Sequence, residues 1–172
     1  MSSTAAKRIA LSVLLAVACG WTGTSFAAKA ESATAVVARL YKDFAWEAMA
    51  GQPKFFGEGL AHQDKATLQR YFTPALTDLL VRDAACQARV QGICNLDFAL
   101  LFYSQDPRVT DLNIQPRAPD QVEVAFKDPV SEERTKIVFQ LTRVDGKWRI
   151  ADILYGQQGT SLKNVLSRRM PR

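Results

Sequence analysis

Apolar residues recur at helical spacing in separate segments between residues 33 and 84, with a loop that holds two glycines expected over residues 54–63. One face of a helix over residues 33–50 would carry the side chains Val36, Val37, Leu40, Tyr41, Phe44 and Ala48. Asp64 is placed to cap a short helix over residues 65–71, and Thr73 with Pro74 forms a cap and first-turn pair that opens a longer one. The apolar face of that longer helix would carry Leu76, Leu79, Leu80 and Ala84. The first half of the chain is therefore predicted to be helical.

The hydrophobic period changes to two from Val109 onward, which is typical of half-buried strands. The alternation predicts strands over residues 109–115, 122–127, 136–143 and 148–155. Asp145-Gly146 indicates a tight hairpin turn, and residues 161–168 are expected to add one or two helical turns. Periodicity does not decide whether the apolar run over residues 97–103 is a strand or a helix. Helices followed by an antiparallel meander indicate an α+β fold.

Length and composition fit one globular domain behind an export signal. The chain has 172 residues, of which 48% are hydrophobic and 23% are charged. Lys7 and Arg8 precede an apolar run over residues 9–21, and Ser25 and Ala27 supply the small residues of a cleavage site. This arrangement is that of a secretory signal peptide, and its apolar run is shorter than the roughly 20 residues of a membrane span. We expect residues 1–27 to be removed, which leaves residues 28–172 as a single domain.

Lipidation of Cys19 is an alternative processing of the N-terminus. Residues 15–20 (LAVACG) resemble a bacterial lipobox, in which the cysteine is acylated and becomes the new N-terminus, although Ala16 stands where leucine is usual. Either processing places the domain outside the cytoplasm, with the periplasm as the expected compartment. Contact with a membrane is expected only through such a lipid anchor.

Charge and cysteine content are informative once the signal segment is set aside. Residues 1–27 hold two of the 22 basic residues and none of the 17 acidic ones, so the net charge falls from +5 to +3. The arginines at positions 168, 169 and 172 account for that excess, which argues against a nucleic-acid partner.

The two remaining cysteines, Cys86 and Cys94, form an even pair in an oxidising compartment. They predict a structural disulfide, because no persuasive metal ligand lies beside them and no Cys-x-x-Cys motif is present.

Several short motifs carry a resemblance to a known superfamily. The run GKWRIADILY over residues 146–155 resembles the last strand of the nuclear transport factor 2-like superfamily. A family of secreted bacterial proteins with a domain of unknown function, which includes enterobacterial lipoproteins, shows motifs similar to Leu96-Asp97-Phe98, Ser104-Gln105-Asp106-Pro107, Tyr155-Gly156-Gln157 and Ser161-Leu162. The resemblance covers about residues 33–167. It implies N-terminal helices packed on a curved antiparallel sheet in a cone-shaped, cystatin-like fold, and it supplies no catalytic residues.

The interior of such a cone is where superfamily enzymes place carboxylates, tyrosines or histidines. A carboxyl group in an apolar pocket has a raised pKa and becomes a useful base near neutral pH. The candidates for pocket residues here are Asp152, Tyr41, Tyr103, Tyr155 and Trp148, with Asp97 and Asp106 as further carboxylates.

Period-two counting decides how the candidates on the last strand are expected to face. It puts Trp148, Ile150 and Asp152 on one side, so Asp152 would point inward unless a bulge intervenes. A structural partner for Asp152 is the preferred interpretation over a catalytic role. We expect Trp148 to be buried between the sheet and the first helix, near Leu40 and Phe44.

The other polar candidates are interpreted structurally. His62 lies in a polar stretch and is expected to be a solvated loop residue. Asp97 could cap the segment that follows it, and Asp106-Pro107 is most simply a turn. The sequence contains no Gly-rich phosphate loop, Gly-x-Ser-x-Gly elbow or calcium-loop spacing, so no cofactor or metal is expected.

These observations favour an exported envelope protein that acts as a non-enzymatic binding or protein-interaction module. Its partner would be an unidentified envelope protein or a small ligand. One alternative is a small-molecule-binding protein or an isomerase- or dehydratase-type enzyme that uses the cone pocket, and another is an immunity protein for a secreted toxin. The deciding observation is whether the cone holds an open cavity with a carboxylate or is filled by aromatic side chains.

Overall fold

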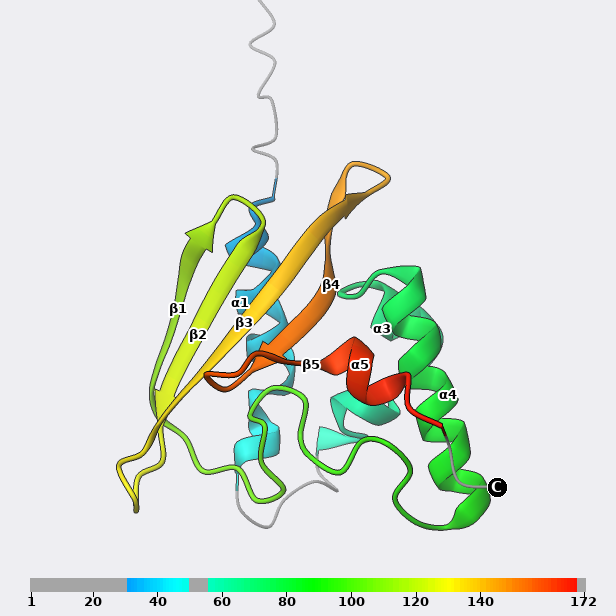
Figure 1. The fold of residues 1–172 in the computed structure, drawn as a ribbon. Coiled ribbons are helices and arrows are strands. Elements are labelled where there is room, and N and C mark those ends of the chain that lie inside the picture. Colours follow the sequence, from blue (N-terminus) through cyan, green and yellow to red (C-terminus); the bar gives the residue numbers. More distant parts are fainter. Residues whose placement is uncertain (1–30, 50–55, 170–172) are drawn as a thin grey trace, which may run out of the picture.

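In a computed structural model, the chain forms an α+β fold in which helices precede a five-stranded antiparallel sheet (Figure 1). The structure describes residues 31–49 and 56–169. The predicted signal peptide over residues 1–27 and the alternative lipidation site Cys19 lie outside these ranges. Within them, no helix has both the length and the apolar character needed to cross a membrane.

The helical half follows the sequence pattern closely. The first predicted helix is α1 (Ala33–Phe44), which tightens into the short 3-10 helix η1 (Ala45–Ala48). The next elements are η2 (Leu60–His62), α3 (Lys65–Gln69) and α4 (Pro74–Val90). The predicted caps are confirmed, since Asp64 accepts a hydrogen bond from the Thr67 amide at 2.7 Å and Thr73 accepts one from the Leu76 amide at 3.4 Å.

The sheet is an antiparallel meander whose strands lie side by side in chain order. Its elements are β1 (Thr110–Ala118), β2 (Gln121–Lys127), β3 (Arg134–Val144), β4 (Lys147–Tyr155) and β5 (Thr160–Ser161), followed by the helix α5 (Leu162–Leu166). The predicted hairpin turn joins β3 to β4, where Asp145 and Gly146 both take positive φ values of 50° and 75°. Such a turn matches the right-handed twist of the strands it connects.

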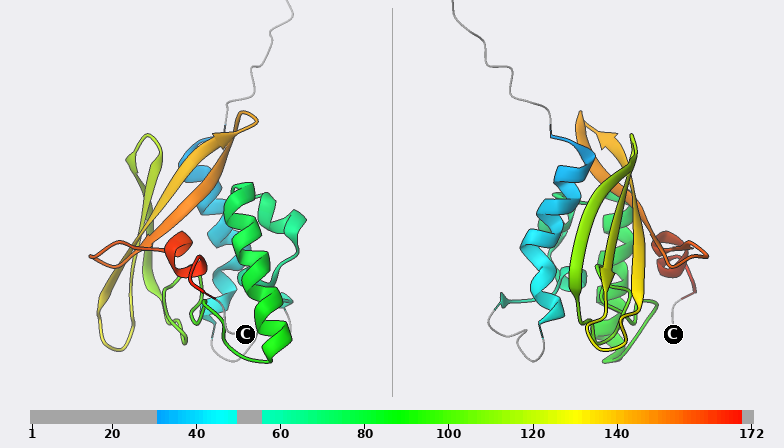
Figure 2. Two further views of the ribbon diagram at one scale, coloured as in Figure 1. Left: turned by 45° about the vertical axis from the view of Figure 1, so that its right-hand side comes forward. Right: turned by 90° about the vertical axis from the view of Figure 1, so that its left-hand side faces the viewer.

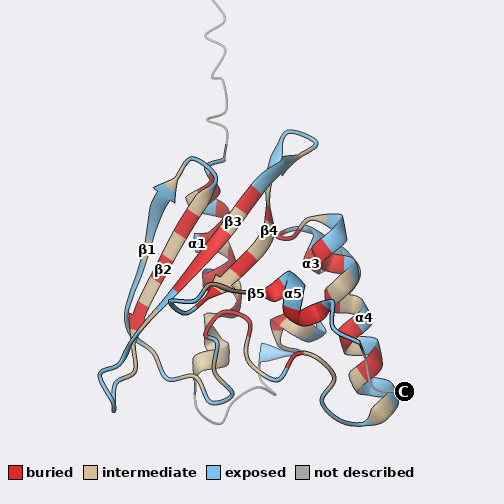
Figure 3. Cartoon of the chain, viewed as in Figure 1, coloured by how far each residue is buried: buried red, intermediate tan, exposed pale blue. Residues whose placement is uncertain are grey.

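The space between α1 and the sheet is filled by aromatic and aliphatic side chains. Helix α1 runs along one face of the sheet, and α4 stands beside β4 (Figure 2). The Tyr41 ring meets Phe102 at 5.9 Å and Phe139 at 6.0 Å between centroids, and Phe102 meets Phe126 at 5.8 Å. Buried positions follow β2, β3 and β4 along this face (Figure 3). The interior is therefore packed with side chains, and a cavity has to be sought at its margin.

A β-bulge in β4 changes which side chains face the core. Gln140 pairs with Asp152 and Leu141 pairs with Ile150, so Ala151 is the extra residue. Beyond the bulge, Ile153 and Tyr155 are buried whereas Asp152 is only partly buried. The simple period-two expectation that Asp152 shares the inward face of Ile150 is therefore wrong, and the bulge is the reason.

Trp148 is less buried than the sequence predicted. Its side chain packs only partly against the core, and the Arg143 guanidinium lies 4.5 Å from the centre of its ring. Arg143 is the residue that pairs with Trp148 across the β3–β4 hairpin. The hairpin extends past the helices (Figure 1), and the Trp148 ring is therefore only partly packed against the core and also contacts a cation.

Candidate functional site

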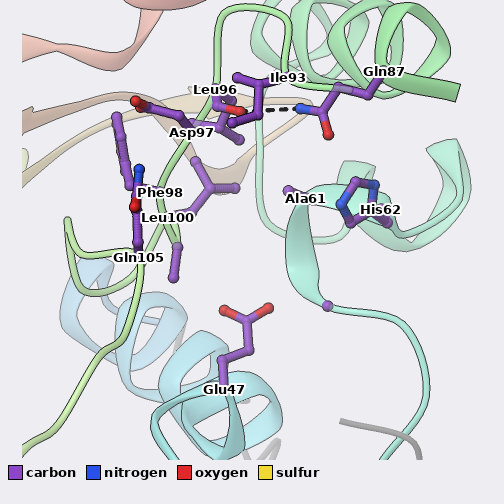
Figure 4. Close-up of a pocket in the computed structure, with 12 residues that line it drawn as sticks. Glu47, Ala61, His62, Gln87, Ile93, Leu96, Asp97, Phe98, Leu100 and Gln105 are labelled. Atoms are coloured by element: carbon purple, nitrogen blue, oxygen red, sulfur yellow. Dashed lines mark hydrogen bonds between the residues drawn. The ribbon is translucent and has the colours of Figure 1, made fainter. Parts of the chain in front are cut away.

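A cavity of about 360 Å³ lies where η1, η2 and the loop after α4 come together (Figure 4). We call it the Glu47 cavity. Its lining mixes polar and apolar side chains, namely Glu47, His62, Gln87, Asp97 and Gln105 with Ile93, Leu96, Phe98 and Leu100, together with Gly59, Ala61 and Ala99. The exposed side chains of His62, Ile93, Asp97 and Gln105 place its rim at the protein surface. A concave site with mixed lining of this size suits a small molecule.

Glu47 provides the carboxyl group of this cavity. The switch from α1 to the 3-10 turn η1 places Glu47 opposite η2, and Figure 4 shows its carboxylate pointing toward the space between η2 and the loop. One oxygen, Oε1, accepts a hydrogen bond from the Leu60 amide at 2.5 Å. The other, Oε2, is buried and has no hydrogen-bond partner within residues 31–49 and 56–169. An unpaired buried carboxylate oxygen is unfavourable unless something donates to it.

The environment of Glu47 raises its pKa. Burial favours the neutral form and is the larger effect, and the hydrogen bond from the Leu60 amide acts in the opposite direction. Gly59 makes the close approach possible, since a Cβ atom there would lie 2.7 Å from Glu47 Oε1. The lack of a side chain at Gly59 therefore allows the Glu47 carboxyl group to lie against the start of η2.

The opposite wall of the Glu47 cavity is fixed to α4 by a buried acid and a disulfide. Asp83 is 1% exposed and accepts hydrogen bonds from the Asn95 amide at 2.9 Å and from Gln87 Nε2 at 2.8 Å. Gln87 Nε2 also donates to the Leu96 carbonyl at 3.1 Å, the dashed line in Figure 4. Cys86 and Cys94 are bonded, with their Cα atoms 6.2 Å apart, as the sequence predicted. These contacts hold the loop against the helix and give the wall a defined position.

His62 reaches the same site from η2. Its side chain is exposed, as expected for a solvated loop residue, and it also lines the rim of the Glu47 cavity beside Ala61 (Figure 4). No hydrogen bond joins His62 to Glu47 among the described contacts, because Oε1 is engaged by Leu60 and Oε2 has no partner. The two groups thus share a cavity without forming a hydrogen-bonded pair.

The predicted tyrosines lie in or beside the core rather than in this cavity. The Tyr41 hydroxyl donates to the Leu101 carbonyl at 2.6 Å, and the Tyr155 hydroxyl donates to the Leu100 carbonyl at 3.0 Å. Burial raises the pKa of both hydroxyls well above the ordinary value for tyrosine. Tyr103 is 41% exposed and stacks on Tyr155 with the ring centres 4.7 Å apart. The two buried tyrosines support the segment over residues 100–101 from inside.

Asp152 has a structural set of partners on the far side of β4. Its carboxylate accepts hydrogen bonds from Ser161 Oγ at 2.6 Å, from the Ile153 amide at 2.9 Å and from the Lys163 amide at 3.0 Å. These bonds tie β5 and the start of α5 to β4.

Of the seven residues predicted for the cone pocket, only Asp97 is among the described residues that line the Glu47 cavity. Asp97 is exposed at the rim, and Asp106 is exposed in a bend nearby.

Sequence reasoning missed Glu47, although the helical pattern contained a signal for it. Glu47 follows Leu40 by seven residues and Phe44 by three, so it belongs to the apolar stripe of the predicted helix. A charged residue in an apolar stripe indicates either a buried partner or a functional role. Gly59 gave no such signal, because the approach of its backbone to Glu47 depends on how the segments fold together.

Comparison with known protein families, curated proteins and solved structures finds no match to this chain. The described residues also contain no group of three or more histidine, cysteine, aspartate or glutamate side chains that could hold a metal ion. The geometry of the Glu47 cavity and the sequence are therefore the features that indicate a function.

Proposed function

We propose that this chain is an exported protein that binds a small molecule in the Glu47 cavity, on a nuclear transport factor 2-like scaffold. The observation that carries the proposal is the Glu47 carboxyl group, which lines a cavity of about 360 Å³ and whose buried Oε2 has no hydrogen-bond partner among the described residues. A bound hydrogen-bond donor would remove the unfavourable burial of that oxygen. Apolar side chains on the loop, such as Leu96 and Phe98, would contact the rest of the ligand.

The order of elements and the cysteine pair support the scaffold and the compartment. Helices followed by a five-stranded antiparallel sheet agree with the order that the superfamily resemblance implies. The bonded pair Cys86–Cys94 suits an oxidising compartment such as the periplasm. The secretory pattern over residues 1–27 and the alternative lipobox at Cys19 supply two routes to the same side of the membrane.

Binding is favoured over catalysis by the contacts of the acidic group. Acid–base catalysis needs a carboxyl group with a raised pKa, which Glu47 has, and normally a second group that is held in position relative to it. His62 is the titratable side chain on the facing turn, and it is exposed and makes no hydrogen bond to Glu47. The arrangement is that of a recognition group in a cavity.

The proposal is tested by filling the cavity. Small fragments are screened against 15N-labelled protein by NMR. A fragment that binds in the cavity should shift the amide signals of Leu60, Ala61, Leu96 and Phe98 in a saturable way. Ala61→Phe, which places a ring in the cavity, should abolish these shifts. The matched control is Ala88→Phe, at an exposed position of α4 outside the lining, and it should leave them intact. Fragment binding that survives Ala61→Phe, or an absence of shifts at these amides, would contradict the proposal.

Processing is tested by the intact mass of protein recovered from the periplasm or the membrane of an expressing bacterium. A chain that begins at Ala28 supports cleavage of a signal peptide, and a diacylglyceryl group on Cys19 supports the lipoprotein alternative. A full-length chain found in the cytoplasm would contradict export by either route.

A further inference from the structure

We propose that the ligand of the Glu47 cavity is a small organic cation, an ammonium group attached to an apolar body. This inference rests on the proposed function and adds the chemical class of the ligand. It follows from the charges, the unpaired oxygen and the apolar wall of the cavity.

The lining of the Glu47 cavity is acidic. Among the described residues that form it, Glu47 and Asp97 carry carboxyl groups, and no lysine or arginine is present. His62 is the remaining titratable side chain and stands exposed at the rim. A cavity with carboxylates and no fixed cation attracts positive ligands and repels anions.

The carboxyl group of Glu47 places the attraction on the η1 side of the cavity (Figure 4). Glu47 Oε1 already accepts from the Leu60 amide, whereas the buried Oε2 has no hydrogen-bond partner in the part of the chain that the structure describes. Because Oε2 is buried in this conformation, a rotation of the Glu47 side chain would bring it to the cavity, where an ammonium N–H would supply both a hydrogen bond and the missing positive charge. Charge-assisted hydrogen bonds of this kind are stronger than neutral ones, and water screens them less in a partly buried site.

The wall opposite Glu47 suits the apolar part of such a ligand. Leu96, Phe98 and Leu100 come from the loop that the disulfide and Asp83 hold to α4. Gln87 directs its amide nitrogen toward the Leu96 carbonyl, which leaves its amide oxygen as a second acceptor on the cavity side (Figure 4). The acceptors and the apolar surface are thus separated in the way that an alkylammonium or arylalkylammonium ion requires.

Three probes of equal length separate charge from shape. Pentylammonium, 1-pentanol and pentanoate are titrated at pH 7 into 15N-labelled wild-type protein, and the amides of Leu60, Ala61, Leu96 and Phe98 are followed. Pentylammonium is expected to bind at least about tenfold more tightly than 1-pentanol, and pentanoate is expected not to bind in the cavity.

Glu47→Gln removes the charge while keeping an oxygen to accept from the Leu60 amide. In this variant the affinity for pentylammonium should fall by about tenfold or more, to the level of 1-pentanol. The matched control is Glu58→Gln, an exposed glutamate outside the lining, which should change neither affinity. The spectrum of each variant without probe shows directly whether it is folded.

The outcomes separate this inference from the proposed function. If 1-pentanol binds as tightly as pentylammonium and Glu47→Gln changes nothing, the cavity binds small molecules but the cation is the wrong class. Binding of pentanoate at the same amides would overturn the inference in the same way. If none of the three probes moves these amides, the ligand class and the small-molecule cavity are both contradicted.

Discussion

At the scale of single residues, the polar side chains of this protein differ in whether their hydrogen bonds are complete. Tyr41 and Tyr155 donate to backbone carbonyls, and Asp152 accepts three hydrogen bonds from β4, β5 and α5. Glu47 has one oxygen paired with the Leu60 amide and one that has no partner among the described residues. A satisfied buried group stabilises the fold, whereas the unsatisfied oxygen of Glu47 is the observation behind the proposed binding site.

Trp148 gives a prediction about stability that depends on its partial burial. Truncating a fully buried large aromatic residue typically costs about 3–5 kcal/mol of the free energy of unfolding, and Phe139→Ala should reach that range because Phe139 is completely buried. Trp148→Ala should cost clearly less, since its ring is only partly packed against the core and lies beside the exposed Arg143 guanidinium. Urea unfolding of both variants measures the difference. Equal losses would show that Trp148 belongs to the core after all.

Hydrophobic periodicity predicts which residues are buried only as long as an element is regular. The pattern correctly marks the buried faces of α1 and β2, because burial on one side of an element leaves a period in its sequence. It misplaces Asp152, since one extra residue in β4 reverses the faces beyond it. Bulges have no reliable sequence signal in this strand, where Ala151 has no glycine or proline beside it.

At the scale of elements, the Glu47 cavity depends on a loop that is held in three ways. The disulfide joins Cys94 to α4, Asp83 binds the Asn95 amide, and Gln87 binds the Leu96 carbonyl. The sequence predicted the disulfide from compartment and spacing. It could not predict the buried Asp83, because an aspartate in the middle of an amphipathic helix has no marker for the distant amide that it accepts from.

The disulfide leads to a prediction that joins stability to the site. In the native protein Cys86 and Cys94 should not react with a thiol reagent. Replacing both by alanine should lower the free energy of unfolding by about 2–3 kcal/mol, because the bridge restricts the unfolded chain. In the double variant, amide hydrogen exchange should also become faster at Asn95 and Leu96, whereas the exchange rates in the distant β2 strand should stay unchanged. A rapid thiol reaction in the folded protein, or unchanged stability of the double variant, would contradict this account.

At the scale of the whole molecule, the class and order of elements were predictable and the cavity was not. Capping residues, the change of period at Val109 and the Asp145-Gly146 turn are local signals, and each is confirmed. The cavity forms where η1, η2 and the loop over residues 93–100 meet, and these segments are far apart in sequence. Residues 71–73 also join the edge of β4 through hydrogen bonds to Ile150. Such contacts depend on tertiary packing, for which the local pattern carries no signal.

The pKa of Glu47 is the property that tests the central claim most directly. It is measured by following the side-chain carboxyl carbon of Glu47 through a pH titration by NMR, first in the free protein and then with saturating pentylammonium. In the free protein, burial should raise the pKa above the value of about 4.3 for an unperturbed glutamate. Bound pentylammonium should lower it, because a neighbouring positive charge favours the ionised carboxylate. An ordinary pKa in the free protein that does not move when the cation is added would contradict the account.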